Sequence, residues 1–484
     1  MAREILINIE SQEKRVAIVE NERLEEFYIE RPQDKTIVGN IYKGKVEAVI
    51  PSIGAAFVDI GLPKKGFLYL AEIIETLEPL EGNNVVKNIE VKKGQEVLVQ
   101  VVKESFGTKG PRLSTHIGLP GRYLVLMPQD PHLGVSRRIE DEGEKRRLKQ
   151  VLGEIKLPKD LGFIVRTVAE GKSKRELFRD ARFLLKLWAR VKRTNQRRTV
   201  PGLVYEEYDI VLRVIRDSFT EEISKLIIDS KFEFRRIRHF MHIFLGYLAK
   251  RVELYKGIDL FTEKGVEKQI SRIFENKVYL KSKAYIVIEQ TEGLVVVDVN
   301  SGGFKKSREP EEMAFKVNSE AAMEIARQLR LRDLGGIIVI DFIDMEKDGH
   351  RLSIFNILHK ELSKDKAKYD VLGISKFGIV ELTRERIHRT ADMLSYQDCP
   401  YCRGKGRVKS PLTIAIYALK ELKRFLAEGA TRESVTIVLH PQVYEEITRE
   451  RQSLNAIERQ FKTKINPVSN PTFHLEELKI SLTE

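Results

Sequence analysis

The sequence predicts a multidomain protein of the α/β class, built from several small units of strands and helices. The chain has 484 residues, which is too long for one ordinary domain and enough for three or four. About 80 residues after Gly39 read as short strands with glycine turns, which is typical of a small barrel. Residues 285–346 read instead as strand, long helix and strand, the pattern of two parallel strands in an α/β sheet.

The composition restricts the class of partner and the compartment. The net charge of +13, from 84 Lys and Arg against 71 Asp and Glu, favours a polyanionic partner. Two cysteines in the whole chain exclude a disulfide framework. No apolar run reaches about 18 residues, so a transmembrane helix is not expected. Because the N-terminus also lacks the apolar core of a signal peptide, we expect a cytoplasmic protein.

The first 30 residues predict a strand meander that needs a partner. The segments ILINI, RVAIVE and LEEFYIE within residues 4–30 read as three short strands joined by polar turns. A meander of this size is too small to fold alone. It must therefore pack on a later part of the chain.

The predicted barrel carries aromatic and basic side chains together. Phe57, Phe67 and Tyr69 are interleaved with lysines such as Lys43 and Lys65. Aromatic rings stack on unpaired bases and lysines contact phosphates, so the combination is typical of a site for single-stranded nucleic acid. The alternative, that the phenylalanines fill the core of the barrel, is equally open from the sequence.

From about residue 119 the chain becomes strongly basic. The strand-like segment GFIVRT (162–167) ends in Arg166 and Thr167. An arginine fork beside a hydroxyl and backbone N–H groups suits a terminal phosphate, whereas a solvated basic loop is the plainer interpretation. A helix is expected over 173–192, where Ser173 and Glu176 form a capping box and Trp188 faces the core.

Two apolar runs within 285–346 read as buried strands, and each ends in an aspartate, Asp298 and Asp341. A carboxylate at the end of a buried strand is costly unless a cation, a proton or a donor satisfies it. The helical pattern between them predicts a crossover that places the two strands side by side and parallel, so both carboxylates fall at one edge of the sheet. Asn300 shares the face of Asp298 if the strand continues. Oxygen ligands are those that Mg²⁺ prefers. The alternative is a pair of loop-edge aspartates with satisfied hydrogen bonds.

Cys399 and Cys402 form a C-x-x-C pair followed by glycines, a shape that zinc knuckles use. Structural zinc takes four ligands, and the chain has no second cysteine pair. Three alternatives stay open: a thioredoxin-like redox motif without its expected context, a third ligand from His388, or two chains that contribute two thiolates each. From residue 411 the sequence predicts a small α/β unit of helix, strand and second helix.

The segments VVVDVNSG (295–302) and NSEAAMEIARQLRLRDLGGIIVIDFIDM (318–345) resemble the catalytic core of the ribonuclease E/G family of bacterial endoribonucleases. The resemblance covers nearly the whole chain, and the absence of a long Pro- or Arg-rich tail makes the chain similar to the shorter members. The resemblance implies the following domains: a ribonuclease-H-like domain in two parts (1–37 and 212–275), an inserted OB-fold RNA-binding domain of the ribosomal S-one type (38–118), a 5′-sensor region (119–211), a DNase-I-like catalytic domain (276–395), a zinc-link (396–410) and a small C-terminal α/β domain (411–484).

The resemblance also implies a catalytic site and a site for the end of the substrate. Asp298 and Asp341 are implied to coordinate the catalytic Mg²⁺, with Asn300 as a supporting polar contact. Arg166 and Thr167 are implied to recognise a 5′-monophosphate on the RNA.

Further contacts to RNA and to a second protomer are implied in the same way. Phe57, Phe67 and Lys109 are implied to hold the RNA strand. Lys368 stands where family members often carry arginine, so its role in orienting a phosphate or in supporting the metal site is open. Cys399 and Cys402 are implied to bind a Zn²⁺ shared between protomers, which gives a zinc-bridged homodimer and, by analogy, a homotetramer made of two such dimers.

These features predict a Mg²⁺-dependent endoribonuclease that hydrolyses single-stranded RNA, and the resemblance implies that it leaves 5′-phosphate and 3′-hydroxyl ends. The resemblance implies stimulation by a 5′-monophosphate and roles in rRNA maturation and mRNA decay. A non-catalytic RNA-binding or ribosome-associated scaffold explains the charge and the barrel but not the paired aspartates. A deoxyribonuclease with the same carboxylates is a further alternative, because the sequence does not show a 2′-hydroxyl being read.

Overall fold

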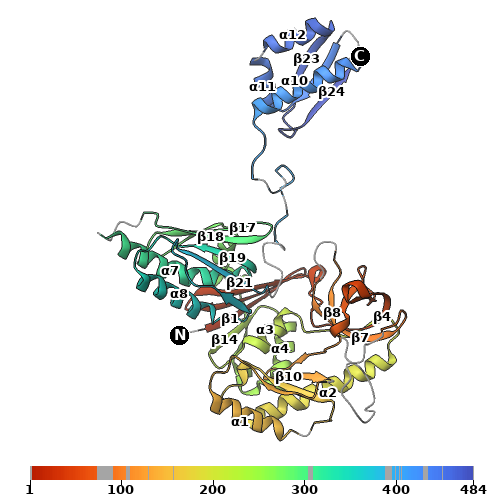
Figure 1. Ribbon diagram of the computed structural model, residues 1–484, viewed down its shortest axis with the longest axis vertical. Helices are drawn as coiled ribbons and strands as arrows, with labels where there is room; N and C mark the ends of the chain where they lie inside the picture. Colours follow the sequence, from red (N-terminus) through yellow and green to blue (C-terminus); the bar gives the residue numbers. More distant parts are fainter. Residues whose placement is uncertain are drawn as a thin grey trace. The chain divides into compact units, whose positions relative to one another are not determined.

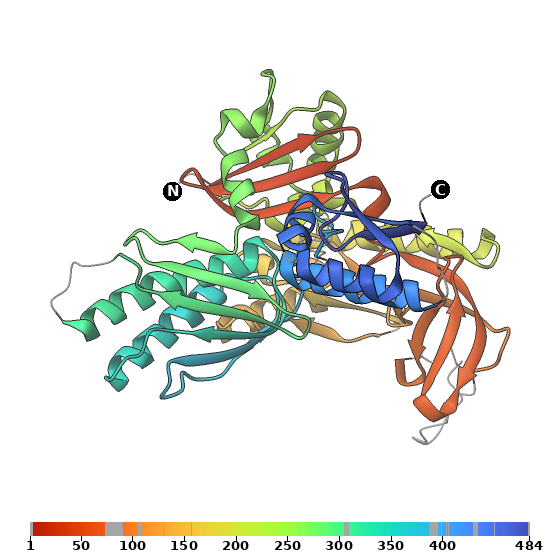
Figure 2. The same cartoon turned by 90° about the horizontal axis from the view of Figure 1, so that it is seen from above.

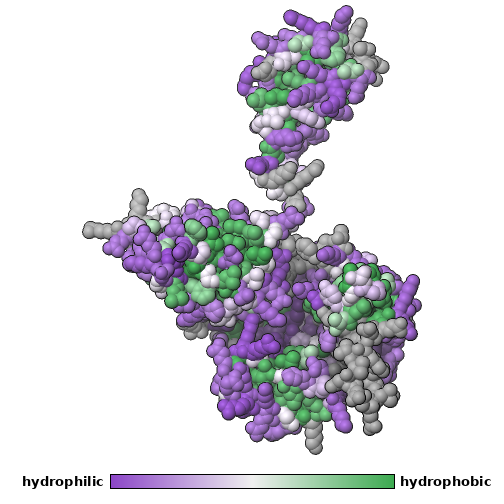
Figure 3. Space-filling view, in the orientation of Figure 1, coloured by the Kyte–Doolittle hydropathy of each residue, from purple (hydrophilic) through white to green (hydrophobic). Residues whose placement is uncertain are grey.

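The computed structural model divides the chain into two compact units, Met1–Leu394 and Ser395–Glu484 (Figures 1 and 2). The residues described are 3–72, 91–104, 109–128, 130–155, 157–303, 309–386, 395–397, 399–402, 404, 406–428, 434–449 and 451–482. Within these ranges no helix is long and apolar enough to cross a membrane. Hydrophilic residues cover much of the face drawn in Figure 3, with smaller apolar patches between them.

The N-terminal meander obtains its partner from a much later part of the chain. The sheet order is β15-β14-β1-β2-β3, in which β1 runs parallel to β14 and antiparallel to β2. One face packs on α3 and α4 and the other on α5 and α6, so the strands are apolar on both sides. The elements are β1 (Arg3–Ile9), β2 (Lys14–Glu20), β3 (Arg23–Glu30), α3 (Ile210–Ser218), β14 (Ile223–Ile228), α4 (Lys231–Phe244), β15 (Val252–Leu254), α5 (Leu260–Glu263) and α6 (Glu267–Ser271).

A closed five-stranded barrel follows the meander. The strand order is β4-β5-β6-β8-β7, and β7 pairs back with β4 to close the barrel, while β13 adds to β4 from outside. The core is small and apolar, with Val46, Val58, Leu68 and Val99 fully buried. The strands are β4 (Ile41–Ile50), β5 (Ala55–Asp59), β6 (Gly66–Tyr69), β7 (Glu96–Lys103), β8 (Arg112–Ser114) and β13 (Gly202–Tyr205).

The basic region between the barrel and α3 forms a small sheet with two helices. The sheet order is β11-β12-β10-β9, and α2 packs its apolar side against β10. The predicted capping box of Ser173 and Glu176 is confirmed at the start of α2, and Trp188 lies in the core as expected. The elements are β9 (Leu119–Pro120), β10 (Leu124–Pro128), β11 (Leu133–Val135), α1 (Glu142–Gly153), β12 (Leu161–Val165) and α2 (Lys174–Arg197).

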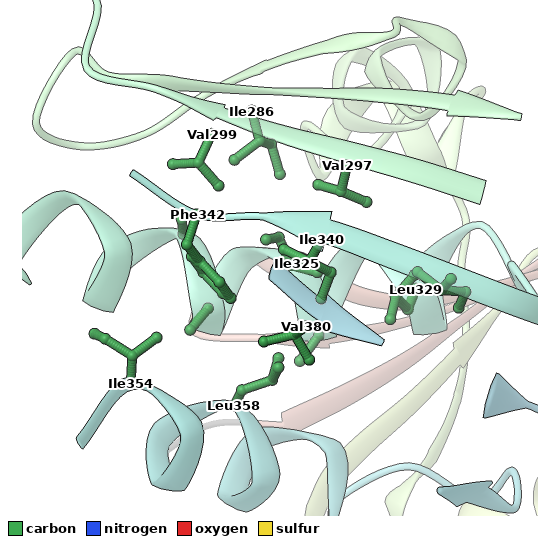
Figure 4. Close-up of a cluster of buried hydrophobic side chains, with 14 of the residues drawn as sticks. Ile286, Val297, Val299, Ile325, Leu329, Ile340, Phe342, Ile354, Leu358 and Val380 are labelled. Atoms are coloured by element: carbon green, nitrogen blue, oxygen red, sulfur yellow. The ribbon is translucent and has the colours of Figure 1, made fainter. Parts of the chain in front are cut away.

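The last part of the first unit is a six-stranded sheet of order β16-β17-β18-β19-β21-β20. The predicted strand, helix and strand are confirmed as β18, α7 and β19, with the two strands parallel. Helices α7 and α8 cover one face, where Val297, Ile340 and Leu358 meet in the apolar core (Figure 4). The elements are β16 (Lys277–Tyr279), β17 (Tyr285–Gln290), β18 (Leu294–Asn300), α7 (Pro310–Leu331), β19 (Gly336–Asp341), α8 (Asp348–Leu362), β20 (Tyr369–Val371) and β21 (Ile379–Arg384).

The second unit is a three-stranded sheet of order β23-β22-β24 with three helices. Its apolar core includes Ile414, Leu422, Ile437 and Ile457. The expected second helix is divided into α11 and α12, and the sequence analysis did not predict the last two strands. The elements are α10 (Pro411–Ala427), β22 (Ser434–Leu439), α11 (Pro441–Arg449), α12 (Arg451–Phe461), β23 (Lys464–Ser469) and β24 (Leu478–Leu482).

Candidate active site and RNA-binding surfaces

The two candidate aspartates lie next to each other across β18 and β19. Asp298 is the direct register partner of Asp341 in the parallel pair. Strand alternation sends Val297 and Ile340 into the core, so both carboxylates stand on the opposite face of the sheet, where both residues are exposed. Neither carboxylate is therefore buried at the end of its strand, so this expectation from the sequence is wrong.

The electrostatics of this pair favour a cation. Asn300 Nδ2 donates to Asp298 Oδ2 over 2.7 Å, which fixes the orientation of that carboxylate. Partial burial and the negative charges of Asp298 and Asp344 raise the pKa of Asp341 above its ordinary value. Since like charges close together disfavour ionisation, a bound cation would offset the part of this shift that comes from Asp298 and Asp344.

The loop that carries Asp344 is held in place by side chains from α7. Asn318, fully buried, donates to the carbonyl of Ile343 over 2.8 Å and accepts from its N–H over 3.1 Å. Glu311 accepts hydrogen bonds from the backbone N–H groups of Glu346 and Lys347. The crossover helix thus connects the two strands and also positions the loop after the second one.

The donor set fits Mg²⁺. Carboxylate and amide oxygens are hard ligands, and Mg²⁺ is commonly held by one or two carboxylates while it keeps several waters and substrate phosphates. Among the described residues, no group of three or more His, Cys, Asp or Glu side chains has the spacing of a metal cage. Asp298 and Asp341 therefore provide an open two-carboxylate site rather than a closed one.

An aromatic and basic cluster on the same face was missed by the sequence analysis. Tyr285 is the register partner of Asn300, and Tyr279 is the register partner of Tyr285. Lys277 Nζ lies 3.6 Å from the centre of the Tyr285 ring, and Tyr279 is 67% exposed. The alternating sequence K-V-Y of β16 indicates that Lys277 and Tyr279 share one face of a strand. Only the register of the sheet shows that this face lies beside Tyr285 and Asn300.

The barrel presents Phe57, Phe67 and Tyr69 on its outside. Phe57 and Phe67 are register partners with ring centres 5.8 Å apart, and Phe67 and Tyr69 are 4.8 Å apart. Both phenylalanines are half-buried, while the neighbouring Val58 and Leu68 fill the core. The alternative that the phenylalanines form the barrel core is therefore wrong.

Two basic residues lie beside this aromatic row. Arg112 pairs in register with Phe67, and its guanidinium stands 4.8 Å from the centre of the Tyr69 ring. Lys109 is exposed at the end of the loop that leads into Arg112, and Gly110 packs directly on the backbone of Lys65. The structure thus brings Lys109 to the region of Phe67, and it adds Arg112, which the sequence analysis did not single out.

The candidate phosphate sensor is held by internal hydrogen bonds. Arg166 Nη1 donates to the carbonyl of Gly121 over 2.7 Å and pairs with Asp217 Oδ1 over 2.7 Å. Thr167 Oγ1 lies 2.9 Å from Ser136 Oγ. Burial alone would raise the pKa of Asp217, but the nearby arginines, Arg166 among them, lower it to about 2. Arg166 is therefore neutralised in this structure and is not a free cation.

Several other cations of the basic region are also used internally. Arg122 is buried and donates to the carbonyls of Ile215, Arg216 and Phe219. Arg147 pairs with Glu144 over 2.6 Å. These residues are structural, so part of the positive charge of this region is used inside the fold.

Lys368 follows a segment that is bound to the loop beside the candidate phosphate sensor. Arg138, from the loop that contains Ser136, donates to the carbonyls of Asp365, Lys366 and Ala367. Lys368 follows this anchored segment directly and is exposed. Its position favours a phosphate contact near the sensor over a role at the metal site.

The two cysteines lie in the second unit. Cys399 is exposed and Cys402 is partly exposed. Backbone N–H groups of Cys402 and Tyr401 donate to the Cys399 sulfur and lower the pKa of its thiol, which favours the thiolate form that binds zinc. No further His, Cys, Asp or Glu among the described residues completes a set of metal ligands. His388, the in-chain alternative, lies outside the described residues.

Three family descriptions match successive parts of the chain. Residues 118–387 match the ribonuclease E/G family, residues 35–116 the S1 RNA binding domain, and residues 398–483 the RNase E/G thioredoxin-like domain. The S1 match and the closed barrel confirm the predicted RNA-binding OB-fold. The third match gives the C-terminal unit a thioredoxin-like fold, which the sequence analysis described only as α/β.

Curated relatives match over almost the full length. Ribonuclease G of Escherichia coli (strain K12) is 40% identical over 97% of this chain and 98% of its own. Ribonuclease G of Haemophilus influenzae is 42% identical over 87% of each chain. Ribonuclease E of Escherichia coli (strain K12) is 39% identical over 94% of this chain and 43% of its own. The chain therefore belongs to the ribonuclease E/G family, and the expectation of an endoribonuclease is confirmed.

Proposed function

We propose that this endoribonuclease cleaves single-stranded RNA by Mg²⁺-dependent hydrolysis and leaves 5′-phosphate and 3′-hydroxyl ends. The observation that carries the proposal is the register of Asp298 and Asp341, which places two carboxylates side by side on an exposed sheet face. Mg²⁺ bound there supplies polarisation of a phosphoryl oxygen and generation of hydroxide from water. A non-catalytic scaffold leaves this arrangement, and the family, unexplained.

The residues of the chain divide the remaining work at the catalytic site. Asp298 and Asp341 hold the cation, and Asn300 keeps one Asp298 oxygen in a fixed direction through its 2.7 Å hydrogen bond. Asp344 adds negative charge near Asp341 and so strengthens the attraction for the cation. Tyr285, next to Asn300 in register, offers a ring on which a nucleotide beside the scissile bond can stack.

The barrel holds the RNA strand. Phe57 and Phe67 form an outward-facing aromatic row for unpaired bases, and Lys109 supplies a cation for the phosphates. This arrangement supports a preference for single strands, since bases inside a duplex cannot reach such rings.

The sensor recognises a 5′-monophosphate on the substrate. Arg166 and Thr167 supply charged and hydroxyl donors, and the exposed Lys368 adds a cation on the same side. Because Asp217 already neutralises Arg166, only a strongly anionic group competes for it, which a phosphate is and a 5′-hydroxyl is not.

A zinc-bridged homodimer completes the proposal, and two such dimers pair into a homotetramer. Cys399 and Cys402 of each of two chains together supply the four thiolates of a tetrahedral site. In the cell we propose a cytoplasmic role in RNA processing, including rRNA maturation, and in mRNA decay. The relatives named ribonuclease G and ribonuclease E support this role.

One experiment tests the core of the proposal. A short A/U-rich RNA, as its 5′-monophosphate and its 5′-hydroxyl form, is incubated with Mg²⁺ and either the native chain or the Asp298→Asn/Asp341→Asn variant. We expect Mg²⁺-dependent cleavage by the native chain, faster for the 5′-monophosphate, and none by the variant, which still binds RNA. A DNA oligomer of the same sequence should stay intact. Undiminished cleavage by the variant refutes the site, and equal cleavage of the DNA refutes the substrate.

A further inference from the structure

A continuous stripe of cations runs along the outer side of helix α2. Arg175 and Arg197 mark its ends, which lie about 33 Å apart at about 1.5 Å per residue. At 3.6 residues per turn its members fall within an arc of about 80°. We call it the α2 stripe, and all its residues are exposed: Arg175, Arg179, Arg182, Lys186, Arg190, Arg193 and Arg197.

The α2 stripe differs from the other cations of the basic region. Among the described residues, no salt bridge to any member of the stripe is found, whereas Arg147, Arg166 and other neighbours are paired. Like charges at helical spacing repel one another, and cations near the helix N-terminus oppose the helix dipole. The stripe is thus a cost to the folded chain that no internal acid in the described ranges offsets, which points to an external anion.

The fold holds the stripe in one direction. The opposite side of α2 is buried through Leu177, Leu184, Trp188 and Val191, so the helix cannot turn about its axis. Near its start, five residues line an open hollow of about 600 Å³ on the surface: Lys174, Arg175, Phe178, Arg179 and Arg182. A row of cations on a helix of fixed orientation, with an open approach, suits a rigid polyanion.

The composition of the stripe indicates which polyanion fits. Every side chain within the arc is a cation, and Phe178, the aromatic residue that lines the hollow, lies outside the arc and is half-buried. Sites for single strands combine cations with exposed aromatic rings that stack on bases, as the barrel does. Double-helical RNA hides its bases and presents phosphates and 2′-hydroxyls, so cations without aromatics are sufficient.

We propose that the α2 stripe binds the phosphate backbone of a double-helical segment of the RNA substrate. Helix α2 packs on β10 of the sensor region at one part and on β13 at another, and Arg198, directly after the stripe, accepts a hydrogen bond at its carbonyl from Lys43 of the barrel. A stem held here is therefore tethered beside the single-strand site, which raises the local concentration of its unpaired flank. The stripe shares no residue with the metal site or the sensor.

The test measures binding of two RNAs without Mg²⁺, so that it does not depend on the metal site. One RNA is an unpaired A/U-rich oligomer, and the other carries the same oligomer joined to a stem of about 16 base pairs, a length that double-strand-binding domains span. The variant Arg182→Gln/Lys186→Gln/Arg190→Gln removes three central cations. The matched control, Lys420→Gln/Lys423→Gln/Arg424→Gln, removes the same charge from exposed positions of α10.

We expect the stripe variant to bind the stem-bearing RNA about tenfold more weakly or worse, with a logarithmic salt dependence shallower by about 2 to 3. The stripe variant should bind the unpaired oligomer as tightly as the native chain does. The control variant should bind both RNAs as tightly as the native chain does. The variant Arg182→Lys/Arg190→Lys keeps the charge and should retain most of the binding to the stem-bearing RNA. Together with unchanged binding of the unpaired oligomer by the Gln variant, this result excludes misfolding as the cause of the loss. Equal losses for both RNAs, or no loss for either, overturn the proposal.

Discussion

Removal of the Asn300 amide tests directly how the carboxylate pair is organised. Asn300 donates to Asp298 Oδ2 over 2.7 Å, so the variant Asn300→Ala leaves the charge of Asp298 intact and deletes only the bond that orients it. Loss of an outer hydrogen-bond partner of a metal ligand typically weakens metal affinity about 10- to 100-fold. We therefore expect the Mg²⁺ concentration for half-maximal cleavage to rise by about that factor, with most of the maximal rate recovered at saturating Mg²⁺.

The assay is cleavage of a 5′-monophosphorylated A/U-rich oligomer over a Mg²⁺ series. Asp298→Asn serves as the comparison, since it removes a ligand and should give no recovery at any Mg²⁺ concentration. Filter binding without Mg²⁺ should be unchanged in both variants. The reasoning is refuted if Asn300→Ala lowers the maximal rate and leaves half-saturation unchanged, because the amide then acts on the phosphate and not on Asp298.

Other side chains give further tests. Tyr285→Ala should raise KM about 5-fold or more without changing kcat, and Tyr285→Phe should not, since stacking contributes about 1–3 kcal/mol per base; equal KM values contradict the stacking role. The raised pKa of Asp341 means that cleavage at low Mg²⁺ falls as the pH drops through that value, and Asp344→Asn should move this acid limb to lower pH in a pH–rate profile. Burial of Glu26 would raise its pKa, but neighbouring cations and a tyrosine hydroxyl lower it to about 2. The stability that ionised Glu26 provides is therefore present above the ordinary pKa of a glutamate and is lost as the pH falls toward 2. Glu26→Gln should lower the free energy of unfolding by at most about 3 kcal/mol in denaturant unfolding at pH 7, and by nothing near pH 2. Cys399→Ser should abolish bound zinc and halve the mass seen in sedimentation; retained zinc at one ion per two chains contradicts the shared site.

The adjacency of Asp298 and Asp341 was predictable because its determinants are local. Two apolar runs joined by a helix specify parallel neighbours, and alternation within each strand specifies the face. The same reasoning gave the capping box of Ser173 and Glu176, whose two members are three residues apart. What failed was the expectation that the carboxylates end buried strands, because the sequence does not tell which face of the sheet the helices cover.

The remaining features depend on long-range pairing. The aromatic cluster near Asn300 exists only through the antiparallel register of β16, β17 and β18. Whether a cation is free depends on acids and carbonyls far along the chain, as with Arg122 and the carbonyl of Phe219, 97 residues apart. The composition counts every arginine toward the net positive charge, although several arginines, such as Arg122, form their hydrogen bonds inside the fold.

The three charged regions differ in how their charge is balanced, and this difference sorts their roles. Around Asp341, partial burial and the negative charges of Asp298 and Asp344 raise its pKa, and a bound cation would offset the repulsion between these charges. At the proposed sensor, Arg166 is already paired with Asp217, so an incoming phosphate would have to exchange with an internal anion, and such an exchange would give selectivity rather than raw affinity. Along α2 the cations have no such competitor among the described residues, so the proposed attraction for RNA would be general and sensitive to salt. We therefore infer that the pairing of arginines separates selective recognition of a strand end from general retention of a substrate, a property that net charge alone does not reveal.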